Sequence, residues 1–244
     1  MRRILMLATG GTIASRECGH GLTPVITSEE ILSYVPDVAK FCQVEGIQLM
    51  NLDSTNVGPE HWLEMASAIR ENYDKYDGFV LTHGTDTMAY TAAALSYLVQ
   101  GSPKPIILTG AQKPINYDST DSKLNLMDAF VCASSDKLSG VNIVFSGRVI
   151  LGTRARKTCS KSFAAFSSIN YPDVGILLDH KLMRYIAPEA QTKPRFYDKM
   201  DNRVALIKMV PGIEPELIDF VLQRNDAVII ECFGVGGLPA YEDR

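Results

Sequence analysis

The sequence predicts an α/β protein with a larger N-terminal domain, built on a mostly parallel, helix-covered sheet, and a smaller, incomplete C-terminal α/β domain. Short apolar runs without polar alternation, such as "GFVL" at 78–81 and "PIIL" at 105–108, indicate strands buried on both faces. Segments with helical spacing separate these runs, which is typical of right-handed βαβ crossovers. An apolar fraction of 46% is enough for a sizeable core.

The elements of the first domain follow in order. A strand is expected at 3–7 and a short helix at 29–34. Pro59 opens the next helix, because proline is favoured at the first helical position. The helix expected at 86–99 carries polar residues in its first turn. Within the Pro59 helix, the residues that recur at helical spacing are Trp62, Ala66, Ile69 and Tyr73. The other expected elements are strands at 48–52, 141–145 and 148–151 and a helix at 122–133.

Composition changes after residue 180, so we expect an N-terminal catalytic domain over 1–180 and a linker over 181–203. A partial C-terminal domain over 204–244 follows, with strands at 205–209 and 227–231 and a helix at 214–223. Two strands and one helix cannot bury their own apolar faces. We therefore expect this part to pack on another subunit or to be a fragment of a longer domain.

Charge and composition exclude several classes of function. A net charge of −4 argues against a nucleic-acid-binding protein and favours small-molecule or protein partners. No apolar stretch approaches the roughly 20 residues of a membrane span, and "MRRILMLATGG" is expected to be a buried first strand rather than a signal peptide. The five cysteines show no CxxC spacing, so neither zinc nor redox chemistry is indicated. A cytoplasmic location is expected.

Polar clusters follow four of the expected strands, at 9–12, 53–56, 82–87 and 109–113. The carboxyl ends of parallel strands share one edge of a sheet, where ligands bind. A single cleft is therefore expected to collect these clusters.

The first cluster, Gly10-Gly11-Thr12, has three interpretations: a phosphate loop, an ordinary turn, or a nucleophile held on a turn. It lacks both GxGxxG and GxxxxGK[ST], so the phosphate loop is weak. Glycine still allows a backbone to approach a ligand closely.

The third cluster places a hydroxyl, Thr85, next to a carboxylate, Asp86, at an expected helix N-terminus. One of them is expected to cap the helix, or the pair serves catalysis beside free backbone N–H groups. A threonine nucleophile needs a base. His83 is one candidate, and a lysine or arginine of a later polar loop is another, at Arg154, Arg156, Lys157 or Lys161. The residues alone leave this choice open.

Five motifs, in order, resemble those of the bacterial-type L-asparaginase family, closest to its cytoplasmic type I branch. They read "TGGTIAS", "DSTNVGPEHW", "THGTDTMAYTA", "LTGAQKP" and "TRARKTCSKSFAAFSSIN". The resemblance implies hydrolysis of L-asparagine to L-aspartate and ammonia, with L-glutamine as a possible second substrate. It also implies no cofactor or metal, a large and a small α/β domain, and a homodimer or homotetramer.

The resemblance also assigns roles to residues. Thr12 is the expected nucleophile and Thr85 the second catalytic threonine, with Lys157 as its proton partner. Asp86 completes this group and holds the α-ammonium of the substrate.

Other residues are expected to bind the substrate. Ser54 binds the α-carboxylate with Thr55 beside it, and the backbone around Ala111 lines the amide pocket. Gly84 belongs to the substrate-binding set, and backbone N–H groups near Gly11 and Thr12 are expected to bind an oxyanion.

Two features depart from the family pattern. A tyrosine usually supports the first threonine, but Leu22 stands at the nearest position here, in a loop with Gly19 and Gly21 as candidate lid hinges. Family members also continue past "FGVGG", so the chain is expected to be short at its C-terminus.

Two other functions remain open at this point. The amidase subunit of glutamyl-tRNA amidotransferase is related, but it carries an additional N-terminal domain, whereas the GGT motif here begins at Gly10. An amino-acid-binding or regulatory homologue with weak or no activity is the second alternative.

Overall fold

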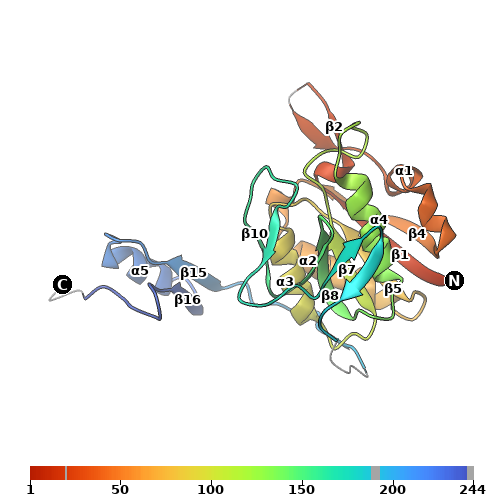
Figure 1. Ribbon diagram of the computed structural model, residues 1–244. Helices are drawn as coiled ribbons and strands as arrows, with labels where there is room; N and C mark the ends of the chain where they lie inside the picture. The colour runs from red at the N-terminus through yellow and green to blue at the C-terminus, as the bar shows by residue number, and fades with distance from the viewer. Residues whose placement is uncertain (20, 188–192, 241–244) are drawn as a thin grey trace. The chain divides into compact units, whose positions relative to one another are not determined.

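The computed structural model describes residues 1–19, 21–187 and 193–240. The chain divides into two compact units, Met1–Asp198 and Lys199–Arg244 (Figure 1). Each unit is described by itself.

The first unit is built on an eight-stranded sheet with strand order β13-β12-β9-β8-β7-β5-β1-β4. Neighbouring strands from β4 to β8 pair in parallel, as the sequence predicts, and the fold class is confirmed. The strands are β1 (Arg2–Gly10), β4 (Cys42–Leu52), β5 (Gly78–Thr82), β7 (Pro105–Thr109), β8 (Gly140–Phe145), β9 (Arg148–Leu151), β12 (Gly175–Leu178) and β13 (Lys181–Arg184).

Helices cover both faces of this sheet (Figure 1). Ile4 and Met6 of β1 pack in one core cluster with α1 (Ser28–Ser33) and α4 (Ser122–Ala133). The alternate residues, Leu5 and Leu7, pack in a second cluster with α2 (Pro59–Asn72) and α3 (Met88–Leu98). Because successive strand residues point to opposite faces, apolar residues at every position of a strand build two cores.

The last three strands of the sheet are antiparallel, which the sequence analysis did not predict. Ser146 and Gly147 both have positive φ and form a two-residue turn from β8 to β9. Asp179 and His180 form an equivalent turn from β12 to β13. Two successive residues of positive φ give the type I′ geometry that suits the twist of a hairpin.

Three small two-stranded sheets complete this unit. They pair β2 (Ser15–Glu17) with β3 (Leu22–Pro24), β10 (Ala155–Lys157) with β11 (Phe166–Ser168), and β6 (Val99–Gln100) with β14 (Arg195–Phe196).

The segment 181–203, expected as a linker, contains two short strands of the first unit, β13 and β14. The expectation of a linker without structure does not hold for them, because their backbone groups complete sheets of the first unit rather than bonding to solvent. Residues 188–192 of this segment lie outside the described residues.

The second unit contains β15 (Val204–Lys208), α5 (Pro215–Leu222) and β16 (Ala227–Glu231), with β15 and β16 parallel. Its elements lie where the sequence predicts them. No residue of α5 is buried. Leu206 and Ile229 are 62% and 59% exposed, so the apolar faces of this unit are largely uncovered.

Among the described residues, no helix is long and apolar enough to cross a membrane.

Candidate active site

A small cleft opens where the loops that follow β1, β4 and β5 come together. Its lining residues are Gly11, Thr12, Ser15, Leu22, Pro24, Asp53, Ser54, Gly84, Thr85 and Asp86. Most of the residues expected to carry function therefore lie at one place.

The glycine pair at the end of β1 forms a turn of positive φ rather than a phosphate loop. Gly10 and Gly11 have φ of 102° and 76°, a region that favours glycine. The N–H of Gly11 donates to the carbonyl oxygen of Leu52 at 2.9 Å, so it is not available for an oxyanion, contrary to expectation. Thr12 begins a 3-10 turn, and its own N–H has no partner within that turn.

Backbones of neighbouring loops touch beneath the cleft. A Cβ added at Gly11 would lie 2.3 Å from the nitrogen of Gly84. A Cβ added at Gly84 would lie 2.6 Å from Oγ of Ser54. Only glycine allows this approach, so these two residues bring the three loops of the cleft together.

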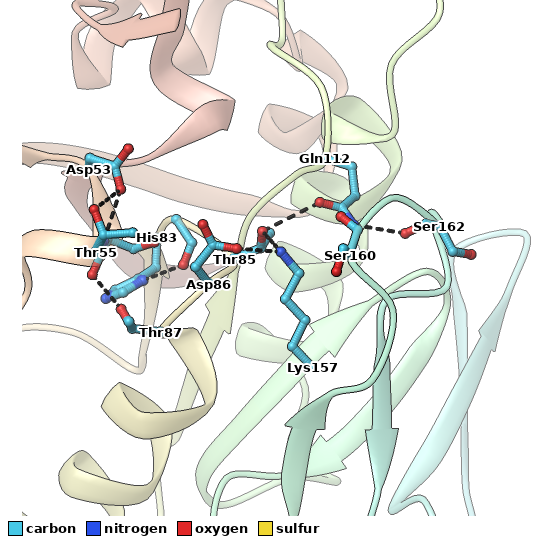
Figure 2. Close-up of polar contacts among 12 residues, drawn as sticks. Asp53, Thr55, His83, Thr85, Asp86, Thr87, Gln112, Lys157, Ser160 and Ser162 are labelled. Atoms are coloured by element: carbon cyan, nitrogen blue, oxygen red, sulfur yellow. Dashed lines mark hydrogen bonds and ion pairs between the residues drawn. The ribbon is translucent and has the colours of Figure 1, made fainter.

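Lys157 joins the two central polar residues. Its Nζ donates to Oγ1 of Thr85 at 2.8 Å and to Oδ1 of Asp86 at 2.6 Å (Figure 2). Of the four basic residues that the sequence left as alternatives, Lys157 is the one placed on this threonine. Its side chain is 16% exposed, whereas that of Asp86 is 59% exposed. The ammonium is thus largely shielded, while the carboxylate remains open to a ligand.

Neither Thr85 nor Asp86 caps a helix. Helix α3 begins at Met88, two residues later than expected, and its N-cap residue Thr87 makes no capping bond. Oγ1 of Thr87 instead donates to the carbonyl oxygen of Ser54 at 2.7 Å. The expected first helical turn at 86 is therefore a separate turn, which leaves the hydroxyl and the carboxylate directed at Lys157.

His83 has a structural role. Its Nδ1 lies 2.7 Å from the carbonyl oxygen of Gly84, which can only accept, so Nδ1 carries the proton. Its Nε2 then accepts from the hydroxyl of Thr91 at 2.9 Å, and Thr91 accepts from the indole of Trp62 at 2.9 Å. Burial lowers the pKa of His83 from 6.5 to about 4. A fully buried, neutral ring below the cleft does not act as the base for Thr85.

The cluster after β4 contributes Ser54 and a carboxylate that the sequence analysis did not assign. Ser54 is buried and lines the cleft, as does Asp53. Thr55 does not line it, because its backbone N–H and its hydroxyl both donate to Oδ1 of Asp53, at 2.9 and 2.8 Å. Thr55 therefore stabilises the turn that presents Ser54.

Ala111 is fully buried in the core and does not line the cleft. The side chain of the next residue, Gln112, lies beside Thr85 instead, with its Oε1 3.4 Å from Oγ1 of Thr85. The backbone N–H groups of Gln112 and Lys113 donate to the carboxylate of Asp121. Gln112 stands within the motif that the sequence analysis singled out, and its side chain rather than the backbone at 111 faces the site.

The β2–β3 hairpin covers one side of the cleft through Leu22 and Pro24. Leu22 is 46% exposed and has no group that accepts a proton. Among the described residues, no tyrosine lines the cleft. Within the same described set, no cluster of three or more His, Cys, Asp or Glu residues is arranged to hold a metal ion.

Comparisons with known proteins agree with this geometry. A sequence profile described as "Asparaginase, N-terminal" matches residues 3–189. The chain is 37% identical to the L-asparaginase of Thermococcus kodakarensis over 242 residues, covering 97% of this chain and 73% of that protein. The solved structure of that thermostable enzyme superposes with a TM-score of 0.89 at 35% identity, covering 98% of this chain and 74% of the other.

Two further relatives carry different names, one an asparaginase and the other an amidotransferase subunit. The structure of L-asparaginase I from Vibrio cholerae matches with a TM-score of 0.86 at 32% identity, covering 99% of this chain and 75% of the other. A glutamyl-tRNA(Gln) amidotransferase subunit from Methanococcus vannielii is 34% identical over 258 residues, covering 98% of this chain and 60% of that protein.

The buried histidine predicts a dependence of stability on pH. His83 is neutral in the folded protein down to about pH 4, whereas in the unfolded chain it takes up a proton below 6.5. Acidification through this window therefore favours unfolding, by about 3 kcal/mol in total for this group. Urea unfolding at about pH 7 and about pH 4.5 measures the loss. His83→Asn keeps a donor for Gly84 and is expected to show a smaller loss; an equal loss would contradict this role.

The glycine contact predicts a loss of stability on adding one methyl group. Gly11→Ala is expected to lower the free energy of unfolding by about 1–3 kcal/mol for strained backbone and by about 1–3 kcal/mol for overpacking against Gly84. Gly140→Ala is the matched control, because Gly140 has φ of 62° but open space around it. It should incur only the backbone part, as measured by urea unfolding. Equal losses in the two variants would show that the close approach is unimportant.

Proposed function

The chain belongs to the asparaginase family, and we propose that it hydrolyses the side-chain amide of L-asparagine to L-aspartate and ammonia. One observation carries the proposal. Lys157 Nζ lies within hydrogen-bond distance of Thr85 Oγ1 (2.8 Å) and Asp86 Oδ1 (2.6 Å), two residues that line one cleft together with Thr12. Two hydroxyls and an amine at one small cleft suit acyl transfer from an amide.

The charges of the cleft suit a small zwitterion. Asp86 gives Lys157 one carboxylate oxygen, which leaves the other for the α-ammonium of an amino acid. Asp53 supplies a second carboxylate to the lining. The Ser54 hydroxyl is the donor for the α-carboxylate, and charge-assisted bonds of this kind are stronger than neutral ones.

The reaction needs a proton to leave a threonine hydroxyl and a proton to reach the departing nitrogen. Lys157 in its neutral form accepts the proton of Thr85 across their 2.8 Å contact. Thr12 attacks the amide carbon directly, or Thr85 activates a water molecule that does so. In the first route Thr12 forms an ester as the C–N bond breaks, and water then cleaves the ester and restores the Thr12 hydroxyl. In the second route water adds to the amide carbon and the C–N bond breaks. In both routes the proton taken up by Lys157 passes to the departing nitrogen, which leaves as ammonia.

Leu22 leaves Thr12 without a tyrosine hydroxyl beside it. The Thr85–Lys157 pair is the described group at the cleft that joins a hydroxyl to an amine. We therefore assign proton transfer for the whole reaction to this pair, including the proton of Thr12.

A second candidate function is the amidase part of a glutamyl-tRNA amidotransferase, favoured by the 34% identity with the amidotransferase protein of M. vannielii. Hydrolysis of free L-asparagine by the chain alone separates the two functions. Substrate binding without turnover, measured by calorimetry, would instead favour a regulatory amino-acid-binding protein.

We also propose that the chain forms a homodimer or homotetramer in the cytoplasm. In the second unit Leu206 and Ile229 are exposed and no residue of α5 is buried. Exposed apolar faces of this kind mark contact surfaces. All five cysteines are unpaired, and Cys18 and Cys159 are exposed, which suits a reducing compartment.

Ammonia release tests the catalytic proposal. The wild-type protein is expected to release ammonia from L-asparagine, and faster than from L-glutamine. Thr12→Ala, Thr85→Val and Lys157→Met are each expected to lower kcat by about 10²–10⁴-fold, the usual contribution of a proton-transfer group or more. Thr153→Val and Lys181→Met are matched controls that lie outside the cleft. Full activity in Thr85→Val would contradict the proposed role of this threonine.

Sedimentation tests the proposed assembly. Purified protein at micromolar concentration is expected to sediment as a dimer or tetramer, because association covers the apolar faces of the second unit. Leu206→Glu and Ile229→Glu are expected to shift it toward monomer. A well-folded wild-type monomer at all concentrations would contradict the proposal.

A further inference from the structure

The side chain of Gln112 connects two parts of the site that are distant in sequence. Its Nε2 donates to the carbonyl oxygens of Ser160 and Ser162, at 3.1 and 2.9 Å. Its Oε1 accepts from Oγ1 of Thr85 at 3.4 Å. Figure 2 shows the amide between the threonine on one side and the loop on the other.

The orientation of this amide is fixed by its partners. Two carbonyl oxygens can only accept, so the NH₂ group of Gln112 must face Ser160 and Ser162. The amide oxygen is then directed at Thr85. Turning the amide over would lose two hydrogen bonds and place its oxygen against two carbonyls.

The direction of the Thr85 hydroxyl follows from this. The Lys157 ammonium has donors only, so in its 2.8 Å contact Oγ1 of Thr85 is the acceptor. The hydrogen of Thr85 is left for another acceptor, and Oε1 of Gln112 supplies it. With Lys157 protonated, the Thr85 hydrogen therefore points to Gln112, and it turns toward Nζ when the neutral amine accepts it.

The loop that Gln112 binds is the one that follows Lys157. Residues 158–165 join β10, which ends at Lys157, to β11. The backbone of Thr158 bonds to Ala165 at 2.8 Å, which closes the base of the loop. Its middle is exposed to solvent, and Gln112 ties it to the loop that follows β7. Lys113 of the same loop adds a weaker contact, with its Nζ 5.6 Å from the centre of the Phe163 ring. The carboxylate of Asp121 in turn fixes the backbone of Gln112.

We propose that Gln112 is a positioning residue, which holds the loop that follows Lys157 and so fixes where the Lys157 amine meets Thr85. The catalytic part of this inference rests on the proposed function. Gln112 does not line the cleft, so its effect is on the reacting groups rather than on substrate binding.

The test compares Gln112→Met and Gln112→Glu with a matched control, Gln43→Met, which changes an exposed glutamine on β4. Two measurements are made on each protein: kcat and KM for L-asparagine, and hydrogen–deuterium exchange of the peptide over 158–165 without substrate. Gln112→Met is expected to lower kcat by up to about 100-fold, the cost of misplacing a reacting group by about 1 Å. KM is expected to stay close to wild type, and exchange in 158–165 to become faster.

Gln112→Glu separates the two contacts of the amide. It keeps an acceptor for Thr85 but sets carboxylate oxygens against Ser160 and Ser162, so loop exchange is expected to rise as in Gln112→Met. Wild-type kcat and exchange in Gln112→Met would overturn the proposal, as would a raised KM with unchanged kcat. If the wild type releases no ammonia while exchange rises only in the Gln112 variants, the proposed function fails and the tether of the loop stands.

Discussion

The cleft depends on loop backbones that pack directly on one another. Gly11 lies against Gly84, and Gly84 lies against Ser54, at distances that leave no room for a Cβ. A third contact of the same kind joins Gly110 and His83, because a Cβ at Gly110 would lie 2.2 Å from the carbonyl oxygen of His83. The floor of the site is therefore formed by main chain at Gly11 and Gly84 together with the buried side chain of Ser54. His83 supports this floor from below as a neutral, buried donor to Gly84.

The position of the Lys157 amine is a second constraint on the site, because Lys157 belongs to a segment far from Thr85 in the sequence. Thr85 and Lys157 are 72 residues apart in sequence, and Lys157 reaches the threonine from the end of a three-residue strand. Such a short hairpin gives little order by itself. Its contacts with Gln112 and with the main sheet, where Arg148 donates to the carbonyl oxygen of Phe166, restrict where the amine can lie. The position of the amine therefore depends on groups that do not line the cleft.

Much of the fold could be predicted from the sequence, because buried parallel strands have an unmistakable apolar pattern. The edge strand β4 was expected only at 48–52, although its earlier residues alternate between polar and apolar, which is the pattern of a half-buried strand. The hairpin turns at 146–147 and 179–180 were missed, because positive φ at Ser146 or Asp179 has only a weak sequence signal. The polar strands β13 and β14 resemble a linker, and their pairing depends on distant strands.

The sequence predicted which residues form the site. The structure adds the direction in which each side chain points, which the spacing of residues along the sequence does not give. Motif resemblance selected Lys157, whereas charge alone left it equal to its basic neighbours. Gln112 and Asp53 were not assigned, because a side chain's direction in a loop cannot be read from its sequence. The central claim is that the cleft binds a zwitterionic amino acid with its side chain between Thr12 and Thr85. A crystal structure of the protein with the product L-aspartate tests it most directly. We expect the α-ammonium to contact Asp86, the α-carboxylate to contact Ser54, and the side-chain carboxylate to lie between the two threonines. L-aspartate bound with its α-carboxylate at Lys157, or bound outside this cleft, would contradict this claim.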